Sequence, residues 1–186
     1  MFLRLGANNL TGNIPAWIGN FSSLNLLKLV RNNFQGSIPS ELGRLLGLEN
    51  FSLSSNYLSG TIPSSIYNIS SIYYFFVIQN QLHGSLPPNI GLTLPNLQIF
   101  FYDNNNFTGP IPTSLSNASQ LQGLCFDGNG LTGTVPRNLA SLQGLVNLYI
   151  IDNKHGYMKD GDLIFLNFLA NFTNLEALRL TTKKGS

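Results

Sequence analysis

The chain has 186 residues, of which 43% are hydrophobic and only 10% are charged, and its formal net charge is +2. Lysine and arginine are scattered, so the clustered positive charge of a nucleic-acid binder is missing, and we expect no nucleic-acid partner. No apolar run reaches the roughly 18 residues that span a bilayer, and residues 1–5 resemble the inside of a repeat more than a signal peptide. We therefore expect no membrane contact by this segment. The single cysteine, Cys125, excludes an internal disulfide.

An asparagine recurs within the pattern L-x-x-N-x-L-x-G-x-I-P, with a spacing of 24 residues five times and 25 residues once. A fixed period in this range indicates a solenoid of stacked turns. We expect these side chains to form a structural ladder along the solenoid. The expected ladder comprises Asn8, Asn32, Asn56, Asn80, Asn105, Asn129 and Asn153.

One turn illustrates how the pattern predicts structure. The alternation around Leu53 predicts a short strand whose inward residues include Leu48, Phe51 and Leu53. Strands of successive turns then stack in parallel at a spacing of about 4.8 Å. Asn56 turns inward at the strand end, where its amide must find hydrogen-bond partners on the backbones of adjacent turns.

The second half of the turn leaves the strand. Gly60 permits a tight bend, Ile62 points inward, and Pro63 marks an extended stretch that cannot continue as a central strand. Residues 64–69 then form a loosely helical outer segment. The predicted fold is an α/β solenoid, a right-handed coil with a parallel β-sheet on the concave face and short helical or 3-10 segments on the convex face.

Two places break the period. Residues 91–96 are one residue longer than their equivalents, and residues 145–174 form a 30-residue irregular turn. The extra length lies at 154–162, ahead of a short amphipathic helix predicted over 163–169. We expect an uncapped solenoid of about seven turns over 1–180 and an atypical, truncated tail over 181–186.

Sequons of the form Asn-x-Ser/Thr are frequent, which favours secretion of the parent protein. Four of them, at Asn20, Asn68, Asn117 and Asn171, occupy the same phase of different turns, on the expected outer rim. The glycosylation candidates are Asn9, Asn20, Asn50, Asn68, Asn106, Asn117 and Asn171.

The repeated L-x-G-x-I-P element, as in residues 10–15 and 58–63, resembles the plant-specific leucine-rich repeat. Residues 84–97 and 162–175 resemble signature stretches in the ectodomains of plant receptor-like Ser/Thr kinases of the subfamily that includes bacterial-pattern receptors. The resemblance reaches from the N-terminus to Leu180. It implies a parent with a membrane span and a cytoplasmic kinase, at the extracellular face of the plasma membrane. It also implies a peptide or protein ligand and a possible co-receptor kinase.

Outward strand positions form columns across the turns, and one region of them is apolar and aromatic. Large exposed apolar patches mark interaction sites. An acidic strip that includes Asp152 lies beside this region, with Lys28 and Arg31 toward the N-terminal end, and could orient a charged peptide. Tolerated surface aromatics and a solvated acidic edge are the alternative interpretations. The candidate ligand-binding residues are Tyr74, Phe76, Ile78, Ile99, Phe101, Asp103, Asp127 and Tyr149.

The sequence contains no recognisable set of catalytic or metal-binding residues. Asp103 and Asp127 would lie about 5 Å apart on neighbouring strands, but an open sheet offers no water-excluding pocket to separate their pKa values. His83 and His155 have no carboxylate or Cys at metal-ligand spacing, and Cys125 is expected to be a lone outward thiol. We expect no enzyme activity, no cofactor and no metal site.

Three functions remain open. The leading interpretation is a ligand-sensing ectodomain segment of a plant receptor-like kinase, acting in defence or development. A secreted inhibitor resembling polygalacturonase-inhibiting proteins uses the same turns, but those proteins have regular turns and cysteine caps. A non-functional truncated receptor fragment is the third interpretation.

Overall fold

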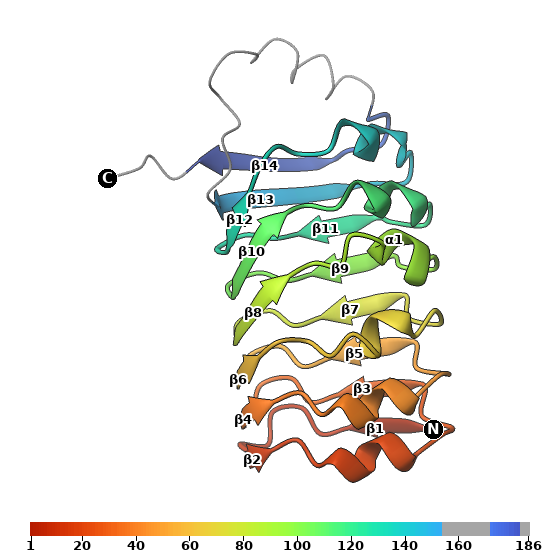
Figure 1. Ribbon diagram of the computed structural model, residues 1–186, viewed down its shortest axis with the longest axis vertical. Helices are drawn as coiled ribbons and strands as arrows, with labels where there is room; N and C mark the ends of the chain where they lie inside the picture. The colour runs from red at the N-terminus through yellow and green to blue at the C-terminus, as the bar shows by residue number, and fades with distance from the viewer. Residues whose placement is uncertain (154–171, 183–186) are drawn as a thin grey trace.

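The chain folds as a stack of turns, which rises from the N-terminal to the C-terminal end in Figure 1. The computed structural model describes residues 1–153 and 172–182. The insertion at 154–162, the helix expected over 163–169, the sequon at Asn171 and residues 183–186 lie outside the described residues.

The predicted parallel sheet is present, and in the described residues it has eight strands in the order β1-β3-β5-β7-β9-β11-β13-β14. Each strand pairs with the strand of the next turn, and equivalent residues face each other across every pair from β1 to β13. The strands are β1 (Phe2–Arg4), β3 (Leu26–Lys28), β5 (Asn50–Ser52), β7 (Tyr74–Phe76), β9 (Ile99–Phe101), β11 (Gly123–Cys125), β13 (Asn147–Asn153) and β14 (Ala177–Thr182).

A second parallel sheet, which the sequence did not lead us to expect, is formed by the L-x-G-x-I-P elements. Its strand order is β12-β10-β8-β6-β4-β2. The glycine of each element has a positive φ, for example 77° at Gly60, so a β-carbon there would be strained. The strands are β2 (Thr11–Asn13), β4 (Asn33–Ser37), β6 (Tyr57–Gly60), β8 (Gln81–Ser85), β10 (Asn106–Pro110) and β12 (Gly130–Thr132). In most turns the proline of the L-x-G-x-I-P element comes after the strand and directly before a helical segment. The strand therefore does not continue past the proline, as expected.

The outer segments are single helical turns. Most are 3-10 helices, and α1 is an α-helical turn because its stretch carries the extra residue, which lets Leu94 donate to the Ile90 carbonyl at 2.9 Å. The longer stretch is thus absorbed outside both sheets. The helical turns are η1 (Ala16–Asn20), η2 (Ser40–Arg44), η3 (Ile66–Asn68), α1 (Ile90–Thr93), η4 (Thr113–Asn117) and η5 (Arg137–Ser141).

The core is a column of inward side chains that extends along the stack. Leu48, Phe51 and Leu53 are fully buried, as predicted. The central residues of β5, β7 and β9 are all phenylalanines, and the Phe51–Phe75 and Phe75–Phe100 ring centroids lie 4.9 and 5.5 Å apart. Edge-to-face and tilted contacts of this kind add to the apolar burial of neighbouring turns.

Each internal ladder asparagine joins its own turn to the backbone of the preceding turn. The Asn56 amide oxygen accepts the N–H of Phe34 at 3.1 Å, and its amide nitrogen donates to the carbonyls of Leu29 and Leu53 at 3.1 and 2.9 Å. The residue before it, Ser55, has a left-handed φ of 56°, which turns the chain inward at the strand end. Equivalent bonds are made by Asn32, Asn80, Asn105, Asn129 and Asn153.

The N-terminal asparagine differs. Asn8 is exposed, and among the residues that the structure describes its amide nitrogen donates only to the carbonyl of Gly6, two residues earlier in its own turn. Each of the other ladder asparagines bonds from its side chain to the backbone of the turn on its N-terminal side. Asn8 makes no such bond to the described residues.

A buried tyrosine pair interrupts the apolar core. The hydroxyl of Tyr102 donates to the hydroxyl of Tyr67 at 2.9 Å, and burial raises the pKa of both phenols. Tyr67 comes from η3 and Tyr102 follows β9, so this bond crosses the interior between the helical side and the sheet. It satisfies two hydroxyls that would otherwise be buried without partners.

The C-terminal end is less regular. The pairing of β13 with β14 shifts register between Ile150 and Asn153. Strand β14 continues to Thr182, two residues beyond the expected end of the solenoid at 180.

The first prediction concerns the ladder. Replacing Asn56 by alanine leaves the N–H of Phe34 without its partner and removes one of the two side-chain donors to each of the Leu29 and Leu53 carbonyls, so we expect it to lower the free energy of unfolding by about 2 kcal/mol. Urea unfolding measures this loss. Asn8→Ala is the matched control, because Asn8 is exposed and its amide does not reach another turn, and it should cost only a few tenths of a kcal/mol. Equal losses in the two variants would show that the ladder bonds do not set stability.

The second prediction concerns the tyrosine pair. Tyr102→Phe removes the donor and leaves the buried Tyr67 hydroxyl unpaired, which we expect to cost about 2 kcal/mol. Tyr67→Phe/Tyr102→Phe removes both hydroxyls and should cost less than the sum of the single changes. A double-mutant cycle of unfolding free energies measures this coupling, and additive losses would contradict it.

Candidate functional site

The outward surface of the eight-stranded sheet is the concave face of the solenoid. The first and third residues of each three-residue strand of this sheet point outward, while the central residue is buried in all of them except β1, where Leu3 is partly buried. Because the register is direct, outward residues of successive turns lie side by side. The main column contains Arg4, Lys28, Ser52, Phe76, Phe101, Cys125, Tyr149 and Arg179.

Five of the predicted binding residues come together: four lie on β7 and β9, and the fifth is two residues after the end of β7. They form the concave apolar patch, defined as Tyr74, Phe76, Ile78, Ile99 and Phe101. All five are partly exposed. The ring centroids of Phe76 and Phe101 are 5.6 Å apart at 75°, an edge-to-face contact between neighbouring strands.

A glycine lets this patch extend sideways. Gly123 on β11 pairs with Ile99 on the preceding strand, β9, and a β-carbon built on Gly123 would lie 3.0 Å from the Phe101 ring and 3.1 Å from Ile99. The two side chains therefore lie over the position that a Gly123 side chain would fill. The patch is packed against the sheet instead of standing freely in water.

The predicted acidic strip needs correction at Asp103. Its side chain is only 7% exposed, because it lies in a column between Ile78 and Asp127 and accepts a hydrogen bond from the Cys125 thiol. Cys125 lies in the outward main column, as the strand alternation predicted, but it is only 6% exposed, so the expected open thiol is covered. Burial raises the pKa of Asp103 and of the Cys125 thiol.

Asp127 completes a small cluster with Asp103 and Cys125. Its carboxylate accepts the N–H of Ile151 at 2.6 Å, and burial raises its pKa as well. The ligand atoms of the three side chains lie within 4.8 Å of one another, a spacing that a metal ion could bridge. Since hydrogen bonds already engage both carboxylates, we interpret the cluster as internally paired polar groups. Burial raises the pKa of both Asp103 and Asp127. A catalytic acid–base pair instead needs two environments that shift the two pKa values in opposite directions.

The remaining predicted residue, Tyr149, lies farther toward the C-terminal end. Its ring is partly exposed, and the Arg179 guanidinium lies 5.1 Å from the ring centroid, a cation–π contact. Tyr149 is separated from Phe101 by Cys125 in the main column, so it is not part of the concave apolar patch.

A basic pocket, which sequence reasoning did not identify, adjoins the patch on its N-terminal side. It has a volume of about 710 Å³. Ser52 and Ser54 form its floor, and the larger Phe76 and Ile78 stand on one side of them. The sequence did contain a signal for this pocket: in the column Lys28-Ser52-Phe76 a small residue lies between two large ones, which predicts a depression at Ser52. The basic residues of the pocket are Arg4, Lys28 and Arg31.

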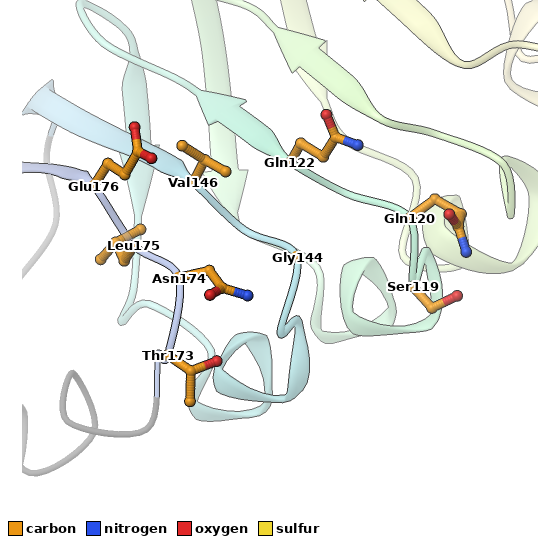
Figure 2. A pocket seen from close by; sticks show the side chains of 9 residues that line it. All are labelled: Ser119, Gln120, Gln122, Gly144, Val146, Thr173, Asn174, Leu175 and Glu176. Atoms are coloured by element: carbon orange, nitrogen blue, oxygen red, sulfur yellow. The ribbon is translucent and has the colours of Figure 1, made fainter.

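A second depression, the lateral hollow, lies where β11, β13 and β14 begin (Figure 2). Its volume is about 610 Å³, and its lining combines Gln122, Val146 and Glu176 from neighbouring strand starts with residues of the preceding loops. Asn174 donates to the Gln143 carbonyl at 2.7 Å. The lining mixes polar and apolar groups, and Glu176 is its one carboxylate among the described residues.

The sequons differ in accessibility. Asn20, Asn68 and Asn117 are exposed at the last residue of η1, η3 and η4, and Asn9 and Asn106 are exposed as well. Asn50 is different, because it lies on β5 in the concave face and its amide oxygen is buried without a hydrogen-bond partner. Glycosylation of the exposed sites remains a prediction, and Asn50 is the least accessible of the candidates in the described residues.

The comparisons agree with the repeat pattern. The Leucine Rich Repeat family matches residues 47–69 and 96–118. No curated protein sequence matches the chain. Among solved structures, the leucine-rich repeat ectodomain of the plant membrane receptor kinase GASSHO1/SCHENGEN3 from Arabidopsis thaliana, in complex with CASPARIAN STRIP INTEGRITY FACTOR 2, is 36% identical. That alignment covers 97% of this chain and 21% of the receptor, with a TM-score of 0.88.

Two further ectodomains are similar. The Arabidopsis receptor kinase HAESA, in complex with the peptide hormone IDA and the co-receptor SERK1, is 26% identical, with 98% of this chain and 34% of that chain covered and a TM-score of 0.75. The ectodomain of the receptor kinase SOBIR1 from Arabidopsis thaliana is 31% identical, with 68% of this chain and 69% of that chain covered and a TM-score of 0.64.

The stacked parallel strands and the asparagine ladder define a leucine-rich repeat solenoid, as predicted. The chain belongs to the leucine-rich repeat ectodomains of plant receptor kinases. It spans about a fifth to a third of the GASSHO1/SCHENGEN3 and HAESA chains. In the part of the chain that the structure describes, no helix is both long and apolar enough to cross a membrane.

The third prediction concerns the buried carboxylate. Because burial raises the folded-state pKa of Asp103 above its ordinary value of 3.8, the folded chain binds this proton more tightly than the unfolded chain. The stabilising contribution of Asp103 is therefore complete below about pH 3.8 and is lost as the pH rises through the folded-state pKa. Asp103→Asn stays neutral, so we expect a higher melting temperature at neutral pH and a smaller gain on acidification than in the wild type.

Melting temperatures of the wild type and of Asp103→Asn are compared at several pH values between about 4 and 7. This pH range lies above the ordinary carboxyl pKa, where the cost of burying the Asp103 charge is expected. Asp152→Asn, at an exposed position of the same face, is the matched control and should retain the wild-type pH dependence. A wild-type pH dependence in Asp103→Asn would contradict a cost of burying the Asp103 charge.

Proposed function

We propose that this chain is a ligand-binding segment of a plant receptor kinase ectodomain, and that it binds a peptide or a short protein segment along its concave face. The observation that carries the proposal is the concave apolar patch. Partly exposed aromatic side chains on a rigid sheet supply contact area at low entropic cost, which is what binding hot spots require. The similar receptor HAESA, which is known with a peptide hormone, supports a peptide as the ligand class.

The proposal extends to the parent protein. We infer that the solenoid lies at the extracellular side of the plasma membrane and that a co-receptor kinase joins the complex, as SERK1 does for HAESA. The exposed sequons at the ends of the helical turns are compatible with that location, because glycans there would point away from the concave face. The receptor neighbours favour this function over a secreted inhibitor of a pathogen enzyme.

The fourth prediction tests the concave apolar patch. Binding of the 186-residue chain is measured against a panel of microbial and plant peptides, and microbial or endogenous origin of the bound peptide separates defence from development. Phe76→Ser/Phe101→Ser should weaken the affinity at least about 30-fold, because truncating central aromatic anchors commonly costs 2 kcal/mol or more.

The matched control is Tyr57→Ser, which removes an aromatic ring that is 57% exposed and lies on β6 of the second sheet. It should bind as the wild type does, and both variants should keep the wild-type circular dichroism. Unchanged affinity in Phe76→Ser/Phe101→Ser would disprove the patch as the binding surface. Failure of the wild type to bind any peptide would count against a receptor function for this segment.

A further inference from the structure

The basic pocket is a step in the concave face, created by side-chain size. Strand β5 and the residues after it present Ser52 and Ser54, whose side chains are short. Lys28 and Val30 stand on the preceding turn, and Phe76 and Ile78 stand on the following turn. The depression is therefore bounded by a cationic wall on one side and an apolar wall on the other.

The cationic wall is electrostatically unsatisfied. Arg4, Lys28 and Arg31 are all exposed, and within residues 1–153 and 172–182 no carboxylate lies within ion-pair distance of any of them. Arg4 stacks on the Phe2 ring with its guanidinium 5.3 Å from the centroid, which leaves its N–H groups free to donate. Three positive charges around one depression attract an anion.

The floor supplies neutral donors. The Ser54 oxygen accepts the N–H of Ile78 at 3.1 Å, so its own proton remains available. Ser52 and Ser54 are 6% and 7% exposed, so a hydrogen bond from them to a ligand would form in a partly desolvated site. An acceptor-rich anionic group fits this floor better than an apolar or cationic one.

We propose that the basic pocket holds the carboxylate side chain of an Asp or Glu within the ligand, two or three residues from a large apolar side chain that packs on the concave apolar patch. This inference rests on the proposed function. The spacing follows from geometry, because Lys28 and Phe76 are two strands apart, about 9.6 Å, and an extended peptide covers that distance in about three residues. The ligand therefore lies across the strands, with its acidic residue toward the N-terminal end of the stack.

The fifth prediction uses a randomised library of short linear peptides that are acetylated and amidated, so that side chains carry the only negative charges. Peptides retained by the 186-residue chain should be enriched in Asp or Glu two or three positions from Phe, Leu, Ile or Met. Changing the acidic residue of a selected peptide to its amide should weaken binding about tenfold, a loss typical of a few charge-assisted contacts, and should remove most of the salt dependence.

Variants of the chain identify the site. In Lys28→Ser/Arg31→Ser the acid and amide peptides should bind equally, while the apolar preference persists. Arg44→Ser/Arg137→Ser removes the same net charge from exposed positions on η2 and η5, and it should retain the wild-type preference for the acid. All four side chains are exposed, so melting temperatures should stay close to that of the wild type.

The outcomes are separable. Selected peptides that lack an acidic preference, or that lose it equally in both charge variants, would overturn the inference and leave the proposed function intact. A preference seen only in a parallel library with free C-termini would assign the pocket to a terminal carboxylate and would also overturn it. If no peptide is retained by the wild type, the proposed function fails, and this inference fails with it.

Discussion

Every other feature of this structure depends on the bonds that the ladder asparagines make to the backbone of the preceding turn. Asn56 binds one N–H and one carbonyl of that turn, and it also binds a carbonyl of its own turn. These contacts fix both the height and the rotation of one turn relative to the next. The direct register of the eight-stranded sheet follows, and with it the alignment of outward side chains into columns. A surface assembled from one or two residues per turn can only be rigid if that alignment is maintained.

The concave face shows how such a scaffold acquires different local chemistry. Its backbone is nearly the same in each turn, so only side-chain size and charge change along the main column. Small serines on and just after β5 create a depression, and phenylalanines on β7 and β9 fill the next two turns. Gly123 lets the Phe101 ring and Ile99 lie against the sheet. Farther along, Asp103 and Cys125 are covered and paired with each other. Charge and apolar contact are thus separated along one axis of a single surface.

The periodic part of the fold could be predicted from the sequence, because inward residues recur at the same position of every turn and each turn must stack on the next. The second sheet was missed, because the repeated glycine and the proline that follows were interpreted as a bend, whereas the glycine lies within the strand and its backbone pairs with the neighbouring turn. Among the candidate site residues, alternation correctly placed Phe76 and Phe101 outward. It failed for Asp103 and Cys125, because outward does not mean exposed when larger neighbours cover a short side chain. The Tyr67–Tyr102 bond joins residues 35 positions apart, a pairing that no local pattern encodes.

The extra residue at α1 indicates how a lineage of such chains can change in length. That stretch lies outside both sheets, and the surplus is taken up by converting a 3-10 turn into an α-helical turn, so the next strand enters in register. Inside a strand, a single added codon would exchange inward and outward side chains for the remainder of that turn and displace its asparagine. Small insertions are therefore tolerable on the helical side, whereas the recognition surface can be extended only by duplicating or deleting whole turns. Between such events, adaptation to a new ligand is confined to point substitutions at outward positions.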